Sequence, residues 1–107
     1  MSKLVGRSTG AAAVAYTLAP DARWMLEEFR IHLSAVGTAG NLTITVDDAD
    51  GAVYDVVLYT LSMVTITDHV WKPVNPIIFD TSDTVVVAWA NASNRTYGIE
   101  IVYSLIA

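Results

Sequence analysis

The chain has 107 residues, no cysteine, six basic and eleven acidic residues, and a formal net charge of −5. This length fits a single domain, and the lack of cysteine excludes disulfides, thiolate metal sites and thiol nucleophiles. The acidic balance argues against a nucleic-acid-binding protein, because neutralising phosphates requires clustered Lys and Arg side chains.

The first ten residues differ in charge from the rest of the chain. Residues 1–10 carry a charge of +2, from Lys3 and Arg7, whereas residues 11–107 carry −7. The Gly, Ser and Thr content of the first segment gives it little to bury. We therefore expect a flexible N-terminal arm over residues 1–10, with Lys3 and Arg7 contacting a partner, and a single domain over residues 11–107.

Alternating hydrophobicity predicts strands through the whole of that domain. A first strand is expected at residues 11–18 and a second within 23–36, where Met25, Phe29, Ile31 and Leu33 share one parity. The remaining expected strands, in chain order, cover residues 42–47, 52–61, 63–70, 77–79, 84–90 and 97–106. Turn-forming residues separate them at 37–41, 48–51, 80–83 and 91–94.

Seven to eight short strands separated by turns at regular intervals are typical of a sandwich or barrel. The sequence thus predicts an all-β fold, an antiparallel β-sandwich in the form of a jelly roll of about eight strands. The β-branched run at 84–90 predicts a central strand buried on both faces. An immunoglobulin-like sandwich is the alternative, weakened by the missing cysteine pair.

The segment 71–76 (WKPVNP) is expected to be a loop or sheet edge, because proline donates no hydrogen bond to a ladder. Trp71 and Lys72 are therefore candidates for partner binding. The other aromatic side chains are expected to lie in the core or in an interface between subunits, with stacking on sugars as the alternative reading.

No catalytic, cofactor-binding or metal-binding residue is predicted, and the chain is not expected to be an enzyme or to need a cofactor. His32 and His69 are expected on polar strand faces, and Glu27 and Glu28 on opposite faces of their strand, unable to form a carboxylate pair. The aspartates around residues 47–55 are better explained as turn residues than as a calcium loop. No apolar stretch approaches the length of a membrane helix, so no membrane partner is expected.

Four segments resemble the small jelly-roll head decoration, or cement, proteins of tailed bacteriophages: residues 41–46 (NLTITV), 50–55 (DGAVYD), 83–91 (DTVVVAWAN) and 95–100 (RTYGIE). The resemblance is a pattern of strands and turns over about residues 16–106 and carries no catalytic motif. It implies a non-enzymatic virion protein on the outer capsid surface, made in the host bacterial cytoplasm.

Its implied partners are the major capsid protein, whose subunit contacts it would stabilise, and further copies of itself. A homotrimer is favoured, and a dimer is the other possibility. Similar small sandwiches also serve phage fibres and baseplates, so a carbohydrate- or receptor-binding module is the alternative function.

Overall fold

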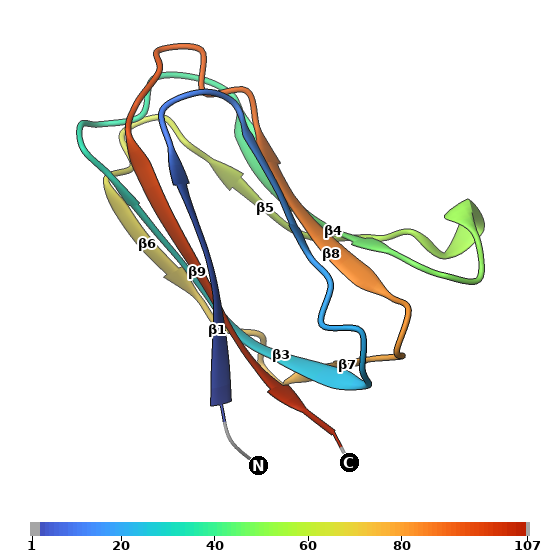
Figure 1. The fold of residues 1–107 in the computed structure, drawn as a ribbon. Coiled ribbons are helices and arrows are strands. Elements are labelled where there is room, and N and C mark those ends of the chain that lie inside the picture. Colours follow the sequence, from blue (N-terminus) through green and yellow to red (C-terminus); the bar gives the residue numbers. More distant parts are fainter. Residues whose placement is uncertain (1–2, 107) are drawn as a thin grey trace.

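A computed structural model describes residues 3–106, and Figure 1 shows that they form two β-sheets packed face to face. The described residues contain nine strands, one short 3-10 helix and no α-helix. The elements are β1 (Lys3–Gly10), β2 (Val14–Leu18), β3 (Trp24–Leu33), β4 (Asn41–Asp47), η1 (Ala52–Tyr54), β5 (Val57–Ser62), β6 (Asp68–Trp71), β7 (Ile77–Phe79), β8 (Thr84–Trp89) and β9 (Tyr97–Leu105).

The strand order confirms the jelly-roll sandwich. One sheet has the order β1-β9-β3-β6, with β7 also paired to β3, and the other has the order β2-β8-β4-β5. The antiparallel pairs are nested along the chain: β1 with β9, β2 with β8, β3 with β6 and β7, and β4 with β5. Because β6 and β7 lie end to end along β3, they act as one interrupted strand, which gives the eight-stranded jelly roll.

A single core lies between the two sheets. Its buried residues come from both sheets, and in strands such as β4 and β8 they alternate with more exposed residues, as expected of a sandwich. The largest fully buried apolar side chains are Trp24, Phe29, Leu26, Leu33, Leu42, Ile44, Met63, Ile99, Ile101, Val85 and Val87. Trp24 stacks on Phe79 with ring centroids 4.6 Å apart.

The central position of β8 is confirmed, since it lies between β2 and β4. The expected burial of both faces was wrong: its residues alternate between buried and half-buried, because only one face meets the core. Two strand boundaries also differ. The segment after the 48–51 turn forms η1 before β5 begins at Val57, and most of 63–70 is a loop that enters β6 at Asp68.

A β-bulge in β3 overturns the prediction that Glu27 and Glu28 face opposite sides. The pairing register with β9 shifts between Leu26 and Glu28, so one extra residue is inserted. Leu26 and Phe29 both point into the core, and the two glutamates between them lie partly buried on the outer side. The parity of the strand therefore changes at the bulge.

The flexible arm is a further prediction that the structure corrects. Residues 3–10 form β1, which pairs with β9 along its whole length, from Lys3 opposite Ser104 to Gly10 opposite Tyr97. Low side-chain burial did not prevent this, because edge strands are held mainly by backbone pairing. The sandwich therefore includes residues 3–10, and residues 1–2 of the expected arm lie outside the described part of the chain.

Candidate functional site

The outer face of the β1-β9-β3-β6 sheet gathers most of the chain's paired charges. The strand registers align its outward side chains in rows across the sheet. One row crosses Arg7, Glu100, Arg30 and Val70. We refer to this surface as the charged face.

Ion pairs link neighbouring strands on the charged face. Glu100 on β9 lies between two cations: Arg7 Nε is 2.6 Å from its Oε2, and Arg30 Nη1 is 3.3 Å from its Oε1. Arg30 also pairs with Glu28, whose other oxygen lies 3.9 Å from Lys72 Nζ. The arginine neighbours, chiefly the hydrogen bond from Arg7, hold the pKa of Glu100 below its ordinary value.

Glu27 anchors the beginning of β1. Ser104 donates a hydrogen bond of 2.5 Å from Oγ to Glu27 Oε2, and Lys3 Nζ lies 3.3 Å from Oε1. The Ser104 hydrogen bond and the Lys3 cation lower the pKa of Glu27, against the opposing effect of partial burial. A carboxylate held ionised in this way has no proton to donate at neutral pH and is a weaker base than an ordinary glutamate.

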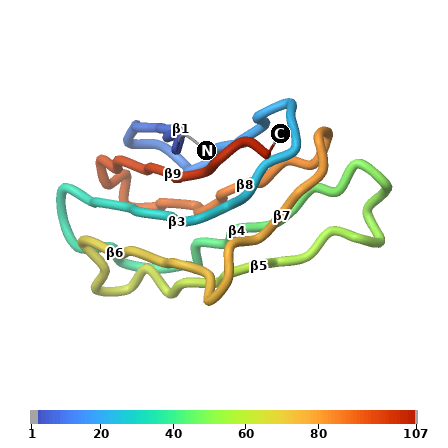
Figure 2. Tube along the Cα trace, turned by 90° about the horizontal axis from the view of Figure 1, so that it is seen from below, coloured from blue at the N-terminus to red at the C-terminus, as the bar shows by residue number. Residues whose placement is uncertain are grey.

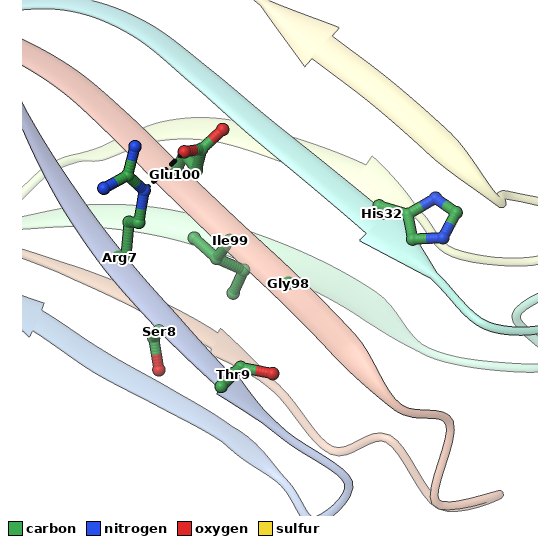
Figure 3. A pocket seen from close by; sticks show the side chains of 7 residues that line it. All are labelled: Arg7, Ser8, Thr9, His32, Gly98, Ile99 and Glu100. Atoms are coloured by element: carbon green, nitrogen blue, oxygen red, sulfur yellow. Dashed lines mark hydrogen bonds and ion pairs between the residues drawn. The ribbon is translucent and has the colours of Figure 1, made fainter.

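The charged face contains open hollows. One of about 430 Å³ is lined by Arg7, Ser8, Thr9, His32, Gly98, Ile99 and Glu100 (Figure 3), and it lies where Gly98 contributes no side chain. A second, of about 320 Å³, brings Lys3 and Lys72 to the same rim, with the two bulge glutamates between them. The charged side chains that line each hollow already pair with one another.

The structure therefore places three of the four candidate binding residues on one face. Lys3, Arg7 and Lys72 all lie on the charged face, and each pairs with a glutamate of the same surface. Trp71 does not join them. It is the last residue of β6, where it pairs with the buried Phe29 and faces the interior of the sandwich.

Trp71 closes one edge of the sandwich. Its ring stacks on Tyr59 of β5 with centroids 4.6 Å apart and an interplanar angle of 10°, and the Tyr59 hydroxyl lies 2.7 Å from His69 Nε2. These contacts join the two sheets. Because β6 is the edge strand of its sheet, the expected sheet edge is confirmed for Trp71, and the chain leaves the ladder only after this residue, at Lys72.

The histidines and aspartates form no metal-binding arrangement within residues 3–106. His32 is exposed and lies 2.5 Å from Asp68, whereas His69 faces inward against Tyr59. Asp48 and Asp55 accept backbone N–H hydrogen bonds inside the β4–β5 connection, which is the role of turn residues. In the same part of the chain, no helix is long and apolar enough to cross a membrane.

Reasoning from the sequence missed one exposed feature. The tip of the β4–β5 connection carries Val53 and Tyr54, which are 87% and 58% exposed, beside the half-exposed Val56 and Val57. The segment was expected to be strand, and alternation assigned Tyr54 and Val56 to one strand face. The available signal was Asp55, a poor strand residue in the middle of the run.

No family model matches the chain, and no curated protein matches it either. Among solved structures, it is similar to a chain of the Bacillus endospore appendages, which are described as "a novel family of disulfide-linked pili". The identity is 14% and the TM-score 0.44, with 99% of this chain and 87% of the other covered. A likeness at this level says nothing about what the present chain binds.

Proposed function

We propose that this chain is a non-enzymatic structural protein of a phage virion, a decoration protein that binds the outer surface of the head. Bound there, it stabilises contacts between neighbouring major-capsid subunits. The proposal extends the sequence resemblance to cement proteins, and the jelly-roll topology is compatible with it. Because one fold can serve many functions, a functional role has to be supported by the residues on the protein surface.

The exposure of large apolar side chains at the tip of the β4–β5 connection is the observation that carries the proposal. Val53 and Tyr54 in this connection are 87% and 58% exposed. Burial of such exposed apolar side chains against another protein surface gives a favourable free energy of binding. The cations of the charged face, in contrast, are already paired within the chain.

Self-association is part of the proposal. A homotrimer around a symmetry axis of the shell would let one decoration unit contact several capsid subunits at once. Such multivalent binding raises the apparent affinity although each chain makes the same contacts as before. The chain would be made in the host bacterial cytoplasm and act on the outer capsid surface.

The alternative, a carbohydrate- or receptor-binding module, would use exposed Trp or Tyr side chains as platforms, and Trp71 was a candidate for that role. The inward orientation of Trp71 and its stack on Tyr59 do not support that role. Trp24 and Trp89 are buried as well, at 0% and 4% exposure. No second candidate function is therefore put forward.

Co-sedimentation tests the proposal directly. Heads assembled without this protein are mixed with the purified chain and pelleted, and saturable uptake at a fixed number of copies per head is expected. A glycan array screened with the same protein serves as the comparison. The proposal fails if heads take up no protein, and it is replaced if a glycan binds and Trp71→Ala abolishes that binding.

A further inference from the structure

The β4–β5 connection extends beyond the body of the sandwich, as Figures 1 and 2 both show. It covers residues 48–56, between the end of β4 and the start of β5. We call this segment the acidic finger, because it contains Asp48, Asp50 and Asp55 and no basic residue.

Hydrogen bonds hold the acidic finger in one shape. At its base, the Val46 N–H donates to the Val56 carbonyl. Inside it, the Asp48 N–H donates to Asp55 Oδ1 at 2.8 Å, and the Asp50 N–H to Asp48 Oδ1 at 2.8 Å. A finger stabilised in this way loses little conformational entropy when it binds.

A further contact fixes the finger to the body of the domain. The Ala49 N–H donates to Asp83 Oδ1 at 3.0 Å. Asp83 is itself buried, its second oxygen accepts the Asp80 N–H, and its carbonyl accepts the Trp24 indole N–H. The anchor of the finger is thus part of the core, so the tip is presented at a defined position.

The tip combines apolar exposure with negative charge. The 3-10 helix η1 holds Val53 and Tyr54 outward, and none of its residues is buried. Within residues 3–106, no cation lies within ion-pair distance of Asp48, Asp50 or Asp55. These three charges, unlike those of the charged face, remain available to a partner.

We infer that the acidic finger is the element that docks on the capsid, with Val53 and Tyr54 entering an apolar pocket rimmed by Lys or Arg of the major capsid protein. This inference rests on the proposed function and names its contact site. Charge complementarity selects that partner chemistry, because an acidic finger is attracted by a cationic rim and repelled by anionic membranes. Tyr is among the residues that most often dominate binding energy at interfaces.

The experiment compares uptake by undecorated heads among single variants. Val53→Ser and Tyr54→Ser should each weaken binding at least about tenfold, the effect of removing an interface hot spot. Val74→Ser is the matched control, because Val74 is equally apolar and even more exposed but lies in another connection, and it should bind as the unaltered protein does. Melting of the free proteins should be unchanged in all three, since these side chains support no packing.

Charge is tested separately with Asp50→Asn, whose carboxylate forms no hydrogen bond or ion pair among the described residues. Binding should weaken, and its dependence on salt concentration should become shallower, because one charge–charge contact is lost.

Each result decides between the claims. If heads bind the unaltered protein and the two tip variants equally well, the docking assignment is wrong while the proposed function stands. If heads bind none of the proteins, both are overturned. If Tyr54→Ser converts an oligomer into a monomer, or if the protein floats with phosphatidylcholine vesicles through this tip, the finger serves another surface and the capsid assignment falls.

Discussion

Gly37 shows how one missing side chain determines a loop. A Cβ atom at this position would lie 2.2 Å from the carbonyl oxygen of Met63, a backbone atom that cannot move aside easily. The Gly37 N–H donates to the Ile66 carbonyl, and its own carbonyl accepts the Thr65 N–H, so the two loops are locked together. A side chain here would separate them.

We expect Gly37→Ala to lower the free energy of unfolding by about 1–3 kcal/mol, the usual cost of forcing atoms into a packed site. Gly98→Ala is the control, because a Cβ there meets no heavy atom within 4 Å and the residue has no positive φ. Its stability should stay within about 0.5 kcal/mol of the unaltered protein. Urea unfolding of both variants measures the difference, and equal stabilities would show that the Gly37 contact relaxes without cost.

Among the elements, β1 departs most from what its sequence suggested. Deleting residues 1–10 should lower the melting temperature by at least about 10 °C or prevent folding, because it removes the partner of β9 along eight residue pairs. It also uncovers Tyr16 and Leu18, which lie against Gly6. Thermal unfolding followed by circular dichroism measures the effect. An unchanged melting temperature would mean that β1 is dispensable and behaves as an arm after all.

The attachment of β1 should depend on pH through Glu27. Its pKa is lowered in the folded protein, so its contribution to stability is fully present above the unfolded value of about 4.3 and is lost as pH falls through the lower folded value. Glu27→Gln should therefore be less stable than the unaltered protein at neutral pH, and the difference should shrink towards about pH 3. Urea unfolding across that range tests this, and a difference independent of pH would show that the charge of Glu27 contributes nothing.

At the scale of the whole molecule, strand count and topology class followed from alternation and turn spacing, because every strand except β1 contributes side chains that lie in the common core or pack against it. Individual predictions were wrong where a feature of the backbone does not change the pattern of apolar and polar residues. The bulge between Leu26 and Glu28 reverses which residues of β3 face the core, and no proline or glycine in the sequence indicates its position. Likewise β1 is half glycine and small polar residues, and it is ordered by pairing with β9, which lies almost a whole chain length away.

The candidate site was less predictable than the fold. Lys3, Arg7 and Lys72 could be named as accessible cations, but their glutamate partners depend on strand registers that no local pattern fixes. Pro73 and Pro76 indicated a loop or sheet edge around Trp71, but they did not indicate that its side chain packs against the core. The acidic finger was missed because its apolar residues were assigned to a strand.

Head stability is the most direct test of the central claim that this protein reinforces an assembled shell. A ligand that binds only the assembled state stabilises it by RT ln(1 + [L]/Kd), which is about 2.7 kcal/mol per site at a hundredfold excess over Kd. DNA release from filled heads should be followed during heating, with and without saturating protein, and Val53→Ser at the same concentration as a control. We predict release at a higher temperature with the unaltered protein and a smaller increase with the variant; heads that bind the protein but release DNA at the same temperature would contradict the claim.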